Sequence, residues 1–145
     1  MGRALTLTDF LGRWAVTRDI RHDDGTEARF EGAAVWTPVA QADCRVTLLP
    51  CAWCTETGWL HIPGQGRFEA ERRYLWDAAL RVHFDDGRFF HAVPPTGGVS
   101  THLCDPDRYT ARYDFSAWPD WTCGWRVDGP RKAYTMTARF RRAAA

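Results

Sequence analysis

Two histidines flank a loop rich in glycine and proline in the segment HAVPPTGGVSTHLCDPD, residues 91–107. Imidazole has an unperturbed pKa near neutrality, so His91 or His102 could transfer a proton as a general acid or base, with Asp107 orienting the ring. In the alternative interpretation, His91 only forms a hydrogen bond within a pair of strands. Ser100 has no nucleophile-elbow context, so the segment does not predict a Ser-His-Asp triad.

A second kind of chemistry is indicated by arginines within stretches of alternating polarity. Arg18 and Arg72 share the phase of the apolar residues around them, which predicts that both side chains point into the interior. A buried guanidinium without a partner is costly, so something must pair with each. The partners are either internal groups, namely tyrosine hydroxyls, backbone carbonyls or a buried acid, with Asp107 and Asp114 as the candidate acids for Arg72, or the acidic group of a bound molecule, which arginine can bind bidentately.

The same alternation turns tyrosines and tryptophans toward the arginines. We predict that the ligand-binding residues are Arg18, Arg72, Tyr74, Tyr109, Tyr113, Trp125 and Tyr134. Among them, Arg72, helped by Arg18 and Tyr74, is expected to anchor the acidic group of a small amphipathic ligand. Trp118, beside Pro119, is expected in a loop between strands.

A possible metal site is suggested by the Cys-x-x-Cys pair Cys51 and Cys54, with Cys44 and His61 nearby in the chain. Four such ligands could form a tetrahedral zinc site. A second Cys-x-x-Cys is absent, however, and the residues after the pair do not resemble the helix of a thioredoxin-like motif. Because the number of cysteines is odd, the sequence favours reduced structural thiols over a disulfide framework. The prediction is no metal and no cofactor.

The elements that position these residues are predicted to be strands, because apolar and polar residues alternate with a period of two along most of the chain. Strands are expected at about residues 14–21, 26–37, 67–76, 80–84, 89–93, 109–115, 121–127 and 134–140, with a short one around His102 and one or two short ones within 41–58. Residues 6–12, TLTDFLG, predict a single helical turn. The orientation of the strand with Phe89, Phe90 and His91 is open, since both phases carry a phenylalanine.

About eight to ten strands joined by short hairpins must each bury one apolar face. Connectivity without long crossovers favours an all-β fold, a single antiparallel up-and-down β-barrel whose interior can hold side chains and one small ligand. No linker or repeat divides the sequence, so residues 1–145 are predicted to form one domain.

Composition restricts the partners and the location. The 145 residues include 19 Lys+Arg and 18 Asp+Glu, a net charge of +1, which argues against nucleic acid as a partner. No stretch approaches the roughly 18 apolar residues of a transmembrane helix, and the first residues contain no secretory h-region. We therefore expect a cytoplasmic protein with a small-molecule partner and no membrane partner, and the oligomeric state is left open.

The stretch FLGRW, residues 10–14, resembles the start of a lipocalin-like (calycin) barrel, in which a helical turn is followed by Gly-x-Trp at the first strand. The resemblance implies that Trp14 plugs one end of the barrel and that an arginine near the end of the last strand packs across it. Arg139 and Arg141 are the candidates for this arginine.

A second resemblance covers nearly the whole chain. The stretches that carry it are ARFEGAAVW, FEAERRYLW, VHFDDGRFFH, THLCDPDRYTARYDF and WRVDGPRKAY. They resemble an uncharacterised bacterial family, a domain of unknown function with a lipocalin-like barrel. This resemblance implies a fold and no activity.

The sequence leaves two principal functions open. One is a binding barrel whose aromatic interior, with its arginines, holds a small acidic ligand. The alternative is an enzyme on the same barrel, an isomerase, cyclase or lyase, in which His91 or His102 moves a proton while Arg72 positions the substrate. A purely structural role would require a filled interior.

Overall fold

The computed structural model describes residues 3–44 and 48–143, and these residues contain ten strands in one antiparallel sheet. The elements are α1 (Leu7–Phe10), β1 (Gly12–His22), β2 (Glu27–Pro38), η1 (Gln41–Asp43), β3 (Ala52–Ile62), β4 (Gly66–Trp76), β5 (Arg81–Phe84), β6 (Phe89–Ala92), β7 (Gly98–Cys104), β8 (Asp107–Asp114), β9 (Trp121–Asp128) and β10 (Ala133–Arg142). The all-β fold with a short N-terminal helical turn confirms the prediction from the alternating sequence.

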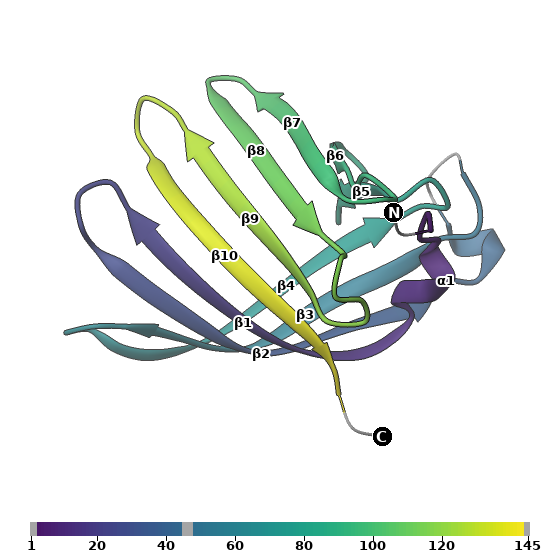
Figure 1. The fold of residues 1–145 in the computed structure, drawn as a ribbon, viewed down its shortest axis with the longest axis horizontal. Helices are drawn as coiled ribbons and strands as arrows, with labels where there is room; N and C mark the ends of the chain where they lie inside the picture. Colours follow the sequence, from purple (N-terminus) through teal and green to yellow (C-terminus); the bar gives the residue numbers. More distant parts are fainter. Residues whose placement is uncertain (1–2, 45–47, 144–145) are drawn as a thin grey trace.

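The sheet curls into a nearly closed up-and-down barrel. Its strand order is β6-β5-β4-β3-β2-β1-β10-β9-β8-β7, so the first and last strands pair with each other and the two edges are β6 and β7. These edges lie side by side (Figure 1). The hairpin turns between the long strands gather at one end of the barrel, whereas α1 covers the opposite end (Figure 1).

The third strand differs from the expectation. Instead of one or two short strands within 41–58, the chain forms the short 3-10 helix η1 and then the long strand β3, which continues past Gly58 to Ile62. β3 pairs with β2 from Ala52 to His61, and Gly32 lies opposite Gly58. A Cβ atom on Gly32 would overlap the Thr57 carbonyl oxygen, so the close approach of these strands depends on glycine.

The orientation of β6, which the sequence left open, is decided by a β-bulge. The register between β5 and β6 shifts between Val82 and His83. Phe89 therefore points outward and is 46% exposed, while the next two side chains, Phe90 and His91, both face the interior. In a regular strand, His91 and Phe90 would point to opposite faces of the sheet. The bulge turns both side chains toward the interior.

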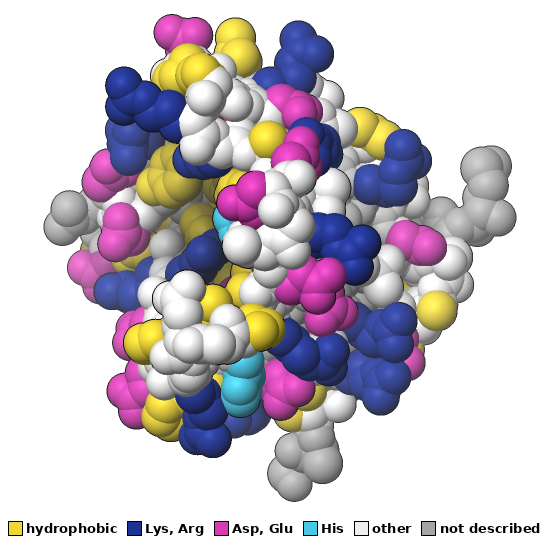
Figure 2. Space-filling model, turned by 90° about the vertical axis from the view of Figure 1, so that its left-hand side faces the viewer, with side chains coloured by type: hydrophobic (Ala, Val, Ile, Leu, Met, Phe, Trp, Pro, Cys, Tyr) yellow, Lys and Arg dark blue, Asp and Glu magenta, His cyan; other side chains and the backbone are white. Residues whose placement is uncertain are grey.

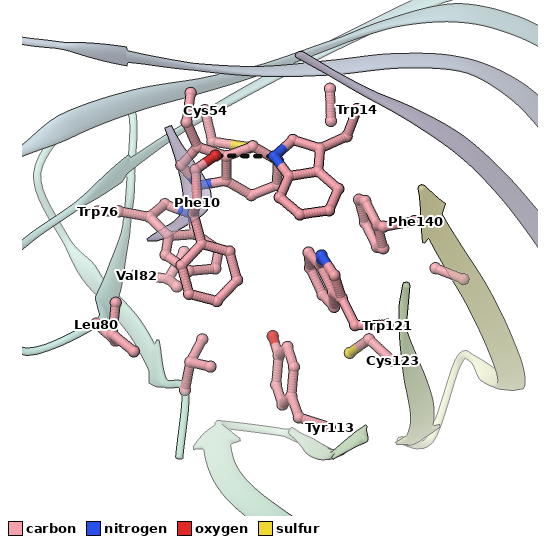
Figure 3. Close-up of a cluster of buried hydrophobic side chains, with 14 of the residues drawn as sticks. Phe10, Trp14, Cys54, Trp76, Leu80, Val82, Tyr113, Trp121, Cys123 and Phe140 are labelled. Atoms are coloured by element: carbon pink, nitrogen blue, oxygen red, sulfur yellow. Dashed lines mark hydrogen bonds between the residues drawn. The ribbon is translucent and has the colours of Figure 1, made fainter. Parts of the chain in front are cut away.

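Aromatic side chains close the end of the barrel beneath α1. We call this cluster the floor; it consists of Phe10, Trp14, Trp36, Trp76, Trp121 and Phe140. Figure 3 shows Phe10, Trp14 and Trp121 converging from different elements. The rings of Trp121 and Phe140 are stacked with centroids 3.9 Å apart. Trp118 lies in the loop before β9, as predicted, and packs against Phe10 with centroids 5.2 Å apart.

Trp14 has the plugging position that the calycin resemblance implies. It is fully buried, and its Nε1 donates a hydrogen bond of 2.8 Å to the carbonyl oxygen of Phe10. The arginine across it is Arg142, whose guanidinium carbon lies 4.0 Å from the ring centroid. The predicted candidates Arg139 and Arg141 are wrong, because they have the opposite phase on β10 from Arg142, the register partner of Trp14.

Arg142 also ties the helical turn to the last strand. Its two terminal nitrogens donate hydrogen bonds to the carbonyl oxygens of Leu11, at 2.5 Å, and Asp9, at 2.6 Å. Gly12 makes room for this arrangement: its φ is +111°, and an added Cβ would lie 2.9 Å from Arg142 Nη1. The Gly-x-Trp motif is therefore explained by a glycine that fits the backbone and the arginine together.

The cysteines depart from the prediction of reduced thiols. Cys44 and Cys51 form a disulfide, whereas Cys54 and Cys123 are free and buried. Cys51 is thus not available to pair with Cys54 in a metal site, and the described part of the chain contains no cluster of His, Cys, Asp or Glu that could hold a metal ion. Within the same part of the chain, no helix has the length and apolar character needed to cross a membrane.

Candidate functional site

The interior of the barrel contains a cavity of about 220 Å³ between the floor and the hairpin end. On the hairpin side the surface is hollowed, with hydrophobic side chains inside the hollow and charged side chains around it (Figure 2). We call this open end the mouth. All seven predicted binding residues line the cavity: Arg18, Arg72, Tyr74, Tyr109, Tyr113, Trp125 and Tyr134. Their contact with a ligand stays a prediction.

Arg18 has an internal partner, Glu56. Its Nη1 and Nη2 donate to Glu56 Oε1 and Oε2 at 2.8 and 2.9 Å, a bidentate ion pair whose side chains are only 11% and 9% exposed. Burial lowers the pKa of Arg18, but the charge and hydrogen bonds of Glu56 more than offset it, and the pKa is raised overall. The requirement for a counter-ion is therefore met within the protein.

The ion pair spans the inner face of β2. Arg18 on β1 lies opposite Phe30 of β2, and Glu56 on β3 lies opposite Ala34. Gly32 occupies the inward position of β2 between these two. Gly32 and Ala34 leave room for the two side chains to meet, and the guanidinium carbon of Arg18 also lies 5.4 Å from the centroid of the Phe30 ring. Glu56 was missed because the irregular segment around Pro50 hid the start of β3, although Glu56 shares the phase of the buried Cys54.

The two acids proposed as internal partners have other roles. Asp107 lies 3.3 Å from Lys132 in a salt bridge near the turns. Asp114 accepts a hydrogen bond of 2.9 Å from the backbone N–H of Ser116 in the loop after β8. Neither acid is therefore the partner of an interior arginine, and this prediction is wrong.

Arg72 lies in the cavity lining but is exposed, which corrects the expectation that it is a buried charge. It is the register partner of Glu56, one strand further from Arg18. Among the described residues, no carboxylate forms a salt bridge with it. Because position 72 is open to solvent at the mouth, the protein carries no desolvation cost that would demand a partner. Arg72 is instead an accessible cation.

Tyrosines surround this cation. Burial raises the pKa of Tyr74, and a hydrogen bond and the charge of Arg72 lower it, with a raised pKa as the net result. Burial likewise raises the pKa of Tyr134, which is also within reach of the charge of Arg72. Both hydroxyls therefore stay protonated at neutral pH and can donate or accept hydrogen bonds beside the guanidinium.

His91 lies deep in the cavity wall. Its Nε2 is 2.7 Å from the Tyr113 hydroxyl, and its ring meets Trp125 edge-to-face with centroids 4.7 Å apart. Burial, with a smaller effect of the charge of His102, lowers the pKa of His91 to about 3. The ring is therefore neutral near pH 7. Its Nδ1 has no hydrogen-bond partner among the described residues.

His102 is not part of the cavity lining. It is half-buried on β7, and its ring lies edge-on to Phe89 and Phe90 with centroids 5.7 and 6.0 Å away. The fold thus places only His91 of the two predicted acid–base candidates against the cavity. A catalytic role for either histidine stays a prediction.

Two cavity-lining thiols were not anticipated as site residues, those of Cys54 and Cys123. Burial raises the pKa of Cys54 well above its usual value and that of Cys123 to about 12. Both thiols are therefore protonated at neutral pH, and a protonated thiol is a poor nucleophile. Their polarisable sulfur atoms form part of the cavity wall.

Comparison with known proteins identifies the fold and the family. The structure of the S-type phycobiliprotein lyase CPES from Guillardia theta is similar with a TM-score of 0.68; the match covers 96% of this chain and 91% of that chain at 11% sequence identity. At this identity the likeness shows a shared fold alone. No curated protein matches the sequence. The model of the Family of unknown function (DUF6314) matches residues 10–142, and the chain belongs to this family, as the resemblance of its strands implied.

Proposed function

We propose that the barrel binds a small aromatic molecule with an acidic group, which Arg72 anchors at the mouth. The observation that carries this proposal is an accessible guanidinium in the cavity wall without a salt bridge to any described carboxylate. Arginine binds carboxylates in a bidentate geometry, and the hydroxyls of Tyr74 and Tyr134 are close enough to the guanidinium to be influenced by its charge.

The walls of the cavity favour an aromatic ring. Phe90 and Trp125 stack with centroids 5.3 Å apart and an interplanar angle of 12°, and Tyr109 meets Phe90 edge-on at 5.6 Å. Such faces and edges suit a planar apolar body. The volume of about 220 Å³ is below the roughly 300–1,000 Å³ of pockets for drug-sized ligands, which supports a small ligand.

A second candidate is an enzyme on the same barrel, and two observations support it. His91 and Tyr113 form a hydrogen bond in the cavity wall, and the structurally similar protein from Guillardia theta is a lyase. A pKa of about 3, however, leaves His91 a weak base at neutral pH, whereas an effective acid–base catalyst has a pKa near the working pH. The binding function therefore has the stronger support.

Native mass spectrometry of the purified protein, searching for a retained small molecule, is the first experiment. Titration calorimetry with benzoate and with its neutral analogue benzamide then tests the acidic group. We expect benzoate to bind at least about tenfold more tightly, since a charge-assisted contact contributes on the order of 1.5–3 kcal/mol. Equal affinity for the two molecules, or no binding of benzoate, would contradict the proposal.

The same titration separates the two candidate functions. In a binding barrel, His91→Gln should retain benzoate affinity, because Gln can still hydrogen-bond the Tyr113 hydroxyl. In an enzyme, this variant would lose turnover of a bound substrate while binding persists. A retained molecule that the wild type converts and the variant does not would favour the enzyme.

A further inference from the structure

The charges along the cavity wall are paired, with one exception among the described residues. Arg18 is neutralised by Glu56 through both carboxylate oxygens. Lys132, which donates a 3.0 Å hydrogen bond to the cavity-lining Tyr109, is paired with Asp107. Arg72 has no salt bridge to a described carboxylate. The cavity thus offers a ligand one uncompensated positive charge.

We propose that Glu56 is a specificity-determining residue that restricts the site to ligands with a single negative charge. The inference rests on the proposed function and names its ligand class: small aromatic monoanions. A ligand with two carboxylates would find one partner in Arg72. Both terminal nitrogens of Arg18 already donate hydrogen bonds to Glu56. The ligand's second carboxylate would lie beside a guanidinium that is not free.

Repulsion adds to this exclusion. Glu56 is the register partner of Arg72 on the neighbouring strand, so a carboxylate held by Arg72 is already close to the carboxylate of Glu56. The partial burial of Glu56 reduces solvent screening of its charge. A monoanion can place its charge toward the mouth and its ring toward Trp125, whereas a second negative charge brings like charges together, which is a common basis of specificity.

Removal of the Glu56 charge should therefore change which acids bind. In Glu56→Gln, Arg18 becomes a second available cation, and a ligand with two adjacent carboxylates can engage both arginines. The probes are benzoate, with one carboxylate, and phthalate, with two adjacent carboxylates. The control Glu69→Gln removes the same charge from an exposed position on the outer face of β4.

Calorimetric titration measures the ratio of phthalate to benzoate affinity in each protein. Because the same two probes are used throughout, a change in this ratio between variants reflects the protein and not the shapes of the probes. We expect wild type and Glu69→Gln to prefer benzoate, and Glu56→Gln to shift the ratio toward phthalate by about tenfold, the effect of one added charge-assisted contact. An unchanged ratio in Glu56→Gln would overturn the inference. So would a wild-type preference for phthalate.

A second variant covers the case in which Glu56→Gln does not fold. In Arg18→Met/Glu56→Leu the ion pair is replaced by apolar side chains, and Arg72 is again the uncompensated cation of the cavity. This variant removes the repulsion by Glu56 without freeing a second cation, so its affinity ratio should shift toward phthalate by less than tenfold. A ratio unchanged from wild type would overturn the inference. If wild type binds benzamide as well as benzoate, the proposed function fails; if benzoate binding is charge-dependent but the ratio never responds to Glu56, only the specificity role fails.

Discussion

The floor and the mouth of the barrel are built from different chemistry. At the floor, Trp14 is fully buried against other aromatic rings and beneath the guanidinium of Arg142, which is itself bonded to backbone carbonyls. At the mouth, Arg72 is exposed, and its hydrogen-bonding neighbour is a tyrosine. The difference indicates that the floor mainly stabilises the fold, while the mouth is free to recognise a ligand. Variants of the two regions should therefore separate stability from binding.

The largest effect is expected at the floor. Trp14→Ala leaves a large cavity among packed aromatic rings and should lower the free energy of unfolding by about 3–5 kcal/mol. Urea denaturation measures this loss. Trp59→Ala is a matched control on the outer face of β3, where the indole stacks under Arg67 at 3.9 Å and its removal should cost about 0.5–1 kcal/mol. Equal losses in the two variants would break the distinction between the floor and the surface.

The ion pair between the two regions comes next. Glu56→Gln leaves the guanidinium of Arg18 nearly buried without its counter-ion and should destabilise the fold by about 3 kcal/mol. Arg18→Met/Glu56→Leu removes both charges and should recover most of this loss. Chemical denaturation of the pair of variants checks the comparison. A double variant as unstable as the single one would show that packing, and not the unpaired charge, dominates at this position.

A smaller effect is expected from pH. The pKa of His91 is lowered from 6.5 to about 3 by burial, so between these values the unfolded chain binds a proton that the folded chain does not. Stability present above pH 6.5 is therefore lost as the pH falls through this window, by about 2 kcal/mol between pH 7 and pH 5. His91→Gln should flatten the profile of unfolding free energy against pH.

The control for this profile is His61→Gln, which removes a histidine from the outer face of β3. It should leave the pH dependence as steep as in wild type. A profile that stays equally steep in His91→Gln would mean that another group carries the acid sensitivity.

Strand periodicity was sufficient to predict the barrel and much of the cavity lining. Where the alternation is regular, as around Arg18 and Arg72, the phase of each side chain follows from its position and the structure agrees with it. The same rule would have selected Arg142 over its neighbours, since Arg142 shares the phase of Phe140 on the last strand. That prediction failed although the signal was present.

Other features depend on information that periodicity does not contain. The bulge that turns Phe90 and His91 to the same side is a register shift between two strands, and a single strand does not reveal it. The pairing of Arg18 with Glu56 requires knowing that β1 and β3 lie on either side of β2. Exposure of Arg72 depends on where the cavity opens, which is a property of the assembled barrel.

The central claim, that an accessible Arg72 anchors an acid, predicts the smallest change in stability. Arg72→Leu removes an exposed charge without a salt bridge to a described carboxylate, so its free energy of unfolding should stay within about 0.5 kcal/mol of wild type. Its benzoate affinity should fall by about tenfold, while benzamide affinity stays the same. Melting temperature and calorimetric titration on this one variant provide the most direct test. A folded variant with undiminished preference for benzoate over benzamide would contradict the account.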